Sequence, residues 1–124
     1  MRVLDVAEPL GAFVSRLLGD LGADVIKVEP PGGDPGRDLS PFITHDSERL
    51  SLPFVRANVN KRSIVLDLEQ REDQEQFRAL VEQSDIVVST EGSATWAARG
   101  IDLERLSVLY PRLIWLSLSP FGLT

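Results

Sequence analysis

The sequence predicts an α/β protein built on a mostly parallel sheet flanked by helices. Two observations indicate this class. Short apolar runs suited to strands alternate along the chain with amphipathic segments suited to helices. The centre of residues 24–29 is apolar except for Lys27, which is typical of a strand buried on both faces of a parallel sheet. The 124 residues are enough for one domain with a single core.

The first thirty residues form one strand–helix–strand unit. Residues 2–6 make a short apolar run and the first predicted strand. Pro9 suits the start of a helix, where its missing N–H is no loss. Gly22 is expected to end this helix with a positive φ, because the chain must turn at once into the strand at 24–29. The apolar residues that follow Pro9 at helical spacing and form one stripe are Leu10, Phe13, Val14, Leu17, Leu18 and Leu21.

Residues 30–60 differ in composition from the rest of the chain. Five prolines and three glycines occur there, and they exclude long regular elements. A connection of this length is typical of a functional or a disordered segment.

Order returns in the second half of the chain. Strands are predicted at residues 63–68, 85–89 and 113–118. A helix is predicted at 71–83, with Phe77, Leu80 and Val81 turned inward, and residues 92–100 form a loop with room for one helical turn. Asp102 suits the N-cap of a further short helix that carries Leu103, Leu106 and Leu109. This order of elements indicates a Rossmann-like architecture.

The chain ends in the loop 119–124, directly after the last predicted strand. We therefore interpret these residues as part of a longer protein.

Composition excludes several kinds of partner. A net charge of −6 argues against nucleic-acid binding, which needs a basic face. The chain lacks the ~18 continuous apolar residues of a membrane span. It has no cysteine and a single histidine, His45, so a metal site is not expected. The absence of cysteine also fits a reducing compartment, and we expect a cytoplasmic protein.

Glu29 leaves two interpretations open. It ends the second predicted strand, where a dinucleotide-binding fold places its ribose-binding acid. The first strand-to-helix turn, residues 7–12, has one glycine in place of G-x-G-x-x-G, which disfavours a nicotinamide-binding domain. The alternative is a strand-end carboxylate that accepts hydrogen bonds from loop amides. Lys61 and Arg62 also have two interpretations. They would either bind phosphates or hold the preceding loop in place above the sheet.

Two further groups of residues are interpreted as structural. Trp96 and Trp115 are expected to anchor the core or a loop. The carboxylates expected to form a solvated helix face are Glu69, Glu72, Asp73 and Glu75.

Six segments carry a resemblance to a known family. In chain order they are LDVAEPLGAF, LLGDLGADVIKVEPPGGDPGR, NVNKRSIVLDL, SDIVVS, GIDLERL and PRLIWLSLSPFG. Together they resemble the N-terminal part of the family III CoA-transferases, a group that includes formyl-CoA and carnitine CoA-transferases and α-methylacyl-CoA racemase. The resemblance covers the whole chain.

The resemblance implies that residues 1–124 are the incomplete, CoA-binding part of a Rossmann-like large domain, within a homodimer of two interlocked chains. It implies an acyl-CoA and a carboxylic acid acceptor as substrates, with CoA as substrate and not as a permanent cofactor. A catalytic aspartate would form a mixed anhydride and then a CoA thioester. That aspartate lies beyond this chain, so no catalytic residue is assigned and the fragment is predicted to be inactive. Asp67 and Asp102 do not match it.

The resemblance also implies a nucleotide site at the carboxyl ends of the strands. Leu66 and Leu68 would flank the adenine, Thr90 would supply a polar contact, and Arg99 or Arg37 would face phosphate. Lys61 and Arg62 precede the third strand, and they are expected at the opposite edge of the sheet, bracing the loop.

Several positions depart from the family pattern. Pro30 and Ala98 stand where the family often has cations, and residues 89–94 lack its asparagine, aromatic residue and Pro-Gly. We expect these changes to weaken CoA binding. The alternatives to a transferase are a degenerate domain with a structural role and a racemase-type isomerase. The acyl group and the acceptor are not specified by the sequence.

Overall fold

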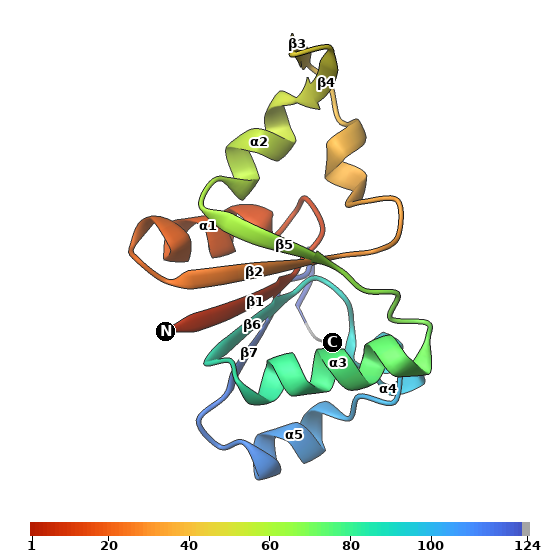
Figure 1. Ribbon diagram of the computed structural model, residues 1–124. Coiled ribbons are helices and arrows are strands. Elements are labelled where there is room, and N and C mark those ends of the chain that lie inside the picture. Colours follow the sequence, from red (N-terminus) through yellow and green to blue (C-terminus); the bar gives the residue numbers. More distant parts are fainter. Residues whose placement is uncertain (123–124) are drawn as a thin grey trace.

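The computed structural model describes residues 1–122, which contain a five-stranded parallel sheet (Figure 1). The strand order is β5-β2-β1-β6-β7. The chain builds the sheet outward from β1 to one edge and then returns to build the other half beside β1. This topology confirms the predicted α/β class and creates a reversal point between β1 and β6. The strands are β1 (Arg2–Val6), β2 (Asp24–Glu29), β5 (Lys61–Val65), β6 (Ile86–Ser89) and β7 (Ile114–Ser117).

Helices cover both faces of the sheet (Figure 1). Helix α1 (Ala12–Asp20) packs on one face through Val14 and Leu18, beside the buried Val3 and Val25. The other face carries α3 (Arg71–Glu82), α4 (Ser93–Ala98) and α5 (Leu103–Leu109). Their apolar side chains pack against the inward residues of β1, β2 and β6.

The central aromatic residue of this second core is Trp96. It is fully buried, stacks on Phe77 with ring centroids 5.3 Å apart, and meets the edge of Trp115 at 5.2 Å. The prediction that both tryptophans anchor the core is confirmed.

Helix α1 differs from its prediction in start and orientation. It begins at Ala12 after the N-cap Gly11, and Pro9 lies in the preceding turn. The fully buried residues of α1 are Ala12 and Ser15. Ser15 faces inward because its hydroxyl donates to the buried carboxylate of Asp5. The apolar stripe is therefore divided: Val14 and Leu18 face the core, and the exposed members are Leu10, Phe13, Leu17 and Leu21.

Gly22 adopts the predicted positive φ, at 102°. The Gly22 amide donates to the carbonyl of Gly19, and the Ala23 amide donates to that of Leu18. These two bonds form a Schellman motif, which satisfies the last helical carbonyls and directs the chain into β2.

The segment 30–60 holds short elements, in agreement with its composition. They are the 3₁₀ helix η1 (Pro35–Asp38), the antiparallel hairpin β3 (Phe42–His45) and β4 (Glu48–Ser51), and helix α2 (Leu52–Asn58). In Figure 1 they rise from one end of the sheet as a projecting arm. The hairpin and α2 were not predicted.

The arm depends on special backbone positions. Asp46 and Ser47 both take positive φ in the two-residue turn of the hairpin. Pro53 lies in the first turn of α2, where proline is tolerated, and Ser51 caps that helix by accepting from the Phe54 amide.

The remaining boundaries match their predictions within one or two residues, except for the third predicted strand. This strand, β5, spans 61–65, so residues 66–68 lie beyond its carboxyl end. Asp102 caps α5 as predicted, accepting from the Arg105 amide at 3.1 Å. Of the leucines on α5, Leu103 and Leu106 pack on the core, whereas Leu109 is exposed.

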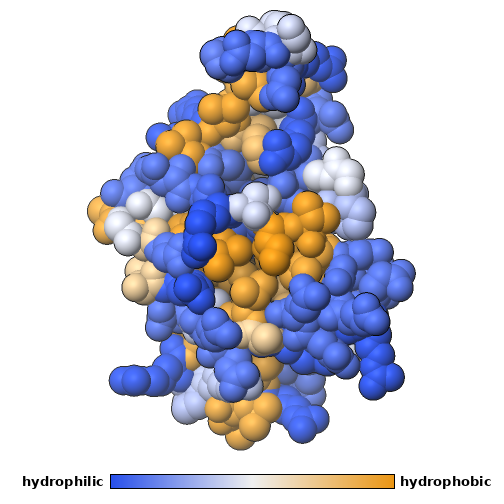
Figure 2. Space-filling model, in the orientation of Figure 1, coloured by the Kyte–Doolittle hydropathy of each residue, from blue (hydrophilic) through white to orange (hydrophobic). Residues whose placement is uncertain are grey.

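Apolar side chains reach the surface between β5 and α3, as Figure 2 shows. Val65, the last residue of β5, is 58% exposed. The carboxyl end of β5 is thus partly open to solvent. Within residues 1–122, no helix is long and apolar enough to cross a membrane.

Candidate functional site

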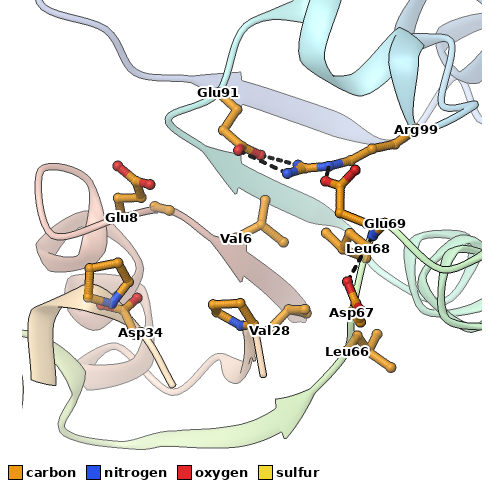
Figure 3. Close-up of a pocket in the computed structure, with 13 residues that line it drawn as sticks. Val6, Glu8, Val28, Asp34, Leu66, Asp67, Leu68, Glu69, Glu91 and Arg99 are labelled. Carbon is orange, nitrogen blue, oxygen red and sulfur yellow. Dashed lines mark hydrogen bonds and ion pairs between the residues drawn. The ribbon is translucent and has the colours of Figure 1, made fainter. Parts of the chain in front are cut away.

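A cavity of about 240 Å³ lies at the carboxyl edge of the sheet (Figure 3). Residues from the ends of four adjacent strands line it: Val6 from β1, Val28 from β2, Leu66 after β5 and Glu91 after β6. The cavity therefore spans the reversal point between β1 and β6. Open α/β sheets bind ligands at this position.

One wall of the cavity is apolar. Leu66 is buried and Leu68 packs on the core, so both side chains are held in place. The Leu66 amide donates to the Glu29 carbonyl at 3.0 Å, and the Leu68 carbonyl accepts from the side chain of Gln74 at 2.8 Å. A rigid apolar wall of this kind suits a flat ring.

Arg99 also lines the cavity, next to Glu69, and is paired with two carboxylates (Figure 3). Its Nη1 and Nη2 both donate to Glu91, the latter at 3.2 Å, and its Nε donates to Oε1 of Glu69 at 3.0 Å. Burial acts to lower the pKa of Arg99, but the bonds to Glu91 and Glu69 outweigh it and raise that pKa. The guanidinium is therefore charged and fully engaged.

The cavity is strongly acidic. Carboxylates that share its lining with the single guanidinium of Arg99 are those of Glu8, Asp34, Asp67, Glu69 and Glu91. These carboxylates repel an anionic ligand, and the repulsion is strongest where water is excluded.

The first strand-to-helix turn does not form a phosphate cradle. The Ala7 amide donates to Asp5 at 2.9 Å, and the Glu8 amide donates to the Thr90 hydroxyl at 3.0 Å. A Cβ added to Gly11 would approach Ala7, Thr90 and Leu118 to 2.9 Å. The N-terminus of α1 is thus closed by protein atoms and differs from a helix end that binds pyrophosphate.

Glu29 is buried and bonded from several sides. Its carboxylate accepts from Arg37 at 2.9 and 3.0 Å, from the Ser63 hydroxyl at 2.7 Å and from the Asp34 amide at 3.4 Å. Burial acts to raise the pKa of Glu29, but these bonds lower it below its usual value. The contacts match the interpretation of a carboxylate that binds the loop, and they leave no ribose-binding role for Glu29.

Arg37 lies in η1, and its guanidinium also stacks over the ring of Phe54 at 4.2 Å. The ion pair with Glu29 raises its pKa, although burial acts in the opposite direction. Arg37 is 45% exposed at its side chain and stands beside the cavity.

Lys61 and Arg62 lie at the amino end of β5, as expected, and they differ in environment. Lys61 Nζ is buried and donates to Asp5 and to the Ala12 carbonyl, both at 2.7 Å, and to Asn58 at 2.8 Å. Burial lowers the pKa of Lys61, against the effect of Asp5. Arg62 pairs with Asp24 at the solvent-exposed amino edge.

The structure brings together some of the predicted site residues. Leu66, Leu68 and Arg99 line the cavity, whereas Thr90 and Arg37 are absent from its lining as far as residues 1–122 define it. Thr90 instead accepts from Glu8, next to the cavity.

Sequence reasoning missed the partners of these residues. Glu69 was assigned to a solvated helix face. It is exposed, as expected, but it precedes α3 and binds Arg99. Asp73 is half-buried and accepts from the Asp67 amide at 2.7 Å, so its assignment to a solvated face is wrong. The buried pair Asp5 and Lys27 was also missed. The sequence does contain a signal for this pair, because β1 and β2 are apolar strands that each carry one charged residue in the interior. These two residues stand opposite each other in the pairing of β1 with β2.

Comparison with known proteins identifies similar chains. A sequence model described as CoA-transferase family III matches residues 1–124. The chain is 42% identical, over 98% of its length, to succinyl-CoA:mesaconate CoA-transferase of Haloarcula hispanica, of which it covers 31%. It is 43% identical, over its whole length, to succinate–glutarate CoA-transferase of Agrobacterium fabrum, of which it covers 32%.

Solved structures give the same result. A CaiB/BaiF family protein from Brucella suis superposes with a TM-score of 0.86 and 39% identity, over 94% of this chain and 32% of that one. The chain spans about a third of the length of these relatives.

Proposed function

Because the chain belongs to CoA-transferase family III, we propose that it is the N-terminal, CoA-binding part of an enzyme that moves CoA between carboxylic acids. The observation that carries this proposal is the cavity at the carboxyl ends of the strands, which is lined by an apolar wall and by a guanidinium. Relatives named for succinyl-CoA, mesaconate, succinate and glutarate support small dicarboxylic acids as the substrate class.

The adenosine part of CoA is assigned to this cavity. Leu66 and Leu68 would flank the adenine, Thr90 would offer its hydroxyl, and Arg99 or Arg37 would face phosphate. A volume of about 240 Å³ is below the ~300 Å³ at which pockets for complete drug-sized ligands begin. We therefore expect only part of CoA to enter, with the pantetheine arm extending over the surface.

The nucleophile is assigned to a residue outside 1–124. A nucleophilic carboxylate must attack the thioester carbonyl, displace the CoA thiolate and form a mixed anhydride. Asp5 is fully buried and bonded to Ser15 and Lys61, so it has no access to substrate. Glu69 and Glu91 are paired with Arg99. In the full-length protein the partners would be an acyl-CoA, a carboxylic acid and a second copy of the chain, in the cytoplasm.

A second candidate is a degenerate domain with a structural role. The paired Arg99, the five acidic side chains of the lining, and Pro30 and Ala98 in place of family cations favour it. This candidate predicts a folded chain without measurable CoA binding.

The two candidates are separated by a titration and an assay on the purified 124-residue chain. Calorimetry with CoA is expected to show binding, and incubation with succinyl-CoA and glutarate is expected to show no exchange of CoA. Exchange that survives rigorous purification would contradict the assignment of the nucleophile. No binding by a chain with a cooperative unfolding transition would favour the structural role.

A further inference from the structure

The ion pairs of Arg99 determine whether its guanidinium is available to bind a phosphate group of a ligand. Glu91 binds both terminal nitrogens of the guanidinium and Glu69 binds Nε. All three nitrogens thus have a carboxylate partner. The Arg99 side chain is only 16% exposed, and its guanidinium also lies 5.2 Å from the ring of Trp96. A phosphate could gain a two-point contact with Arg99 only by displacing Glu91 from the two terminal nitrogens or Glu69 from the edge that includes Nε.

Neighbouring cations do not replace Arg99. Arg37 is bound on two nitrogens by Glu29, and Lys27 is buried between Asp34 at 2.9 Å and Asp5 at 3.7 Å. Each of these cations is therefore neutralised by a carboxylate of the same chain. The apolar wall of the cavity suits a ring, and within residues 1–122 each nearby cation is already paired with a carboxylate.

From this geometry we propose that Glu69 and Glu91 are specificity-determining residues, which occupy Arg99 and so remove recognition of the ribose 3′-phosphate of CoA. The inference rests on the proposed function, because it assumes that the adenosine part of CoA enters this cavity. It widens the ligand class from acyl thioesters of CoA to acyl thioesters of CoA or of dephospho-CoA. Each carboxylate acts through Arg99.

The probes are CoA and dephospho-CoA, which differ only in the 3′-phosphate. Wild-type chain is expected to bind the two within about threefold of each other. In Glu69→Gln/Glu91→Gln the guanidinium is released, and CoA is expected to bind at least about tenfold more tightly than dephospho-CoA. Adding Arg99→Ala to this variant is expected to abolish the preference, which separates the release of Arg99 from the simple removal of acidic charge.

A matched control changes the same net charge elsewhere. Glu72 and Glu75 lie on α3 and do not line the cavity as residues 1–122 define it. Glu72→Gln/Glu75→Gln is expected to leave the ratio of the two affinities unchanged. Thermal unfolding of every variant checks that the fold is retained.

Two results would contradict this inference and leave the proposed function unaffected. One is a wild-type preference for CoA above about tenfold, and the other is a double variant that binds both probes equally. Failure of wild type and double variant to bind either probe, with cooperative unfolding retained, would instead reject the proposed function and the inference with it.

Discussion

Glu29 and Arg37 form a two-point ion pair that ties the projecting arm to the sheet. Nε of Arg37 lies 2.9 Å from Oε1 of Glu29, and Nη2 lies 3.0 Å from Oε2. Between them runs the loop that contributes Pro30, Asp34 and Pro35 to the cavity lining. The pair therefore positions one side of the cavity without entering it.

This pair predicts a dependence of stability on acidic pH. The folded-state pKa of Glu29 is lowered from 4.5, so its contribution is complete above that value and is lost as pH falls through the lower folded pKa. Glu29→Gln is expected to flatten the acid decline of the free energy of unfolding, measured with urea from about pH 7 to about pH 3. Glu48→Gln, at an exposed strand position, serves as control. An acid decline in Glu29→Gln as steep as in wild type would contradict the prediction.

The two adjacent cations at the start of β5 are expected to differ in their effect on stability. Lys61→Met leaves the buried Asp5 with its hydrogen bonds from Ser15 and Ala7 but with Lys27, at 3.7 Å, as its one cationic partner within residues 1–122, and is expected to cost about 3 kcal/mol. Arg62→Met removes an exposed pair with Asp24 and is expected to cost far less. Denaturant unfolding measures both. Equal losses would show that the buried network does not stabilise the sheet as described.

Gly22 provides a test of backbone strain alone. Among residues 1–122, a Cβ at Gly22 would meet no atom within 4 Å outside the two chain neighbours, but the φ of 102° disfavours any side chain. Gly22→Ala is therefore expected to cost ~1 kcal/mol of unfolding free energy. Gly92 has equally open surroundings and a φ of −76°, so Gly92→Ala is the matched control and should be nearly neutral. Equal effects of the two substitutions would exclude strain as the cause.

A hydrogen bond between Trp96 and Ser89 joins α4 to the end of β6 within the core that contains Phe77. Nε1 of Trp96 donates to the Ser89 hydroxyl at 3.0 Å, and both residues are fully buried. Ser89→Ala leaves this donor unpaired and is expected to cost about 1–3 kcal/mol. Ser107→Ala removes an exposed hydroxyl from α5 and is the control. A Ser89→Ala protein as stable as wild type would show that the indole finds another partner.

Local patterns were enough to predict the strands of the parallel sheet, although β5 lies two to three residues before its predicted place, and also the inward face of α3 and the turn at Gly22. Each of these depends on neighbours in the sequence. Leu66 and Leu68 were assigned from the resemblance to the family, within the predicted strand 63–68, and they lie beyond β5 in the lining of the cavity. The orientation of α1 was not predictable from periodicity, since Ser15 is drawn inward by Asp5 on another element.

The polar partners could not be predicted for a related reason. Arg99 binds Glu91 and Glu69, which are 8 and 30 residues away and come from separate loops. Lys61 and Asp5 are 56 residues apart and meet only when β1 and β5 assemble on either side of β2. Charge pairing at such separations is fixed by the topology of the sheet, not by local spacing.

The most direct test of the central claim is amide-shift mapping of the isotope-labelled chain during titration with CoA, together with the affinity of Arg99→Ala. We predict shifts centred on residues 66–69 and 90–99 at the carboxyl edge. We also predict an affinity lowered about tenfold in Arg99→Ala, because loss of the lining guanidinium leaves its carboxylates uncompensated. Shifts confined to residues 58–62, or an affinity unchanged by the substitution, would contradict the assignment of this cavity to the nucleotide.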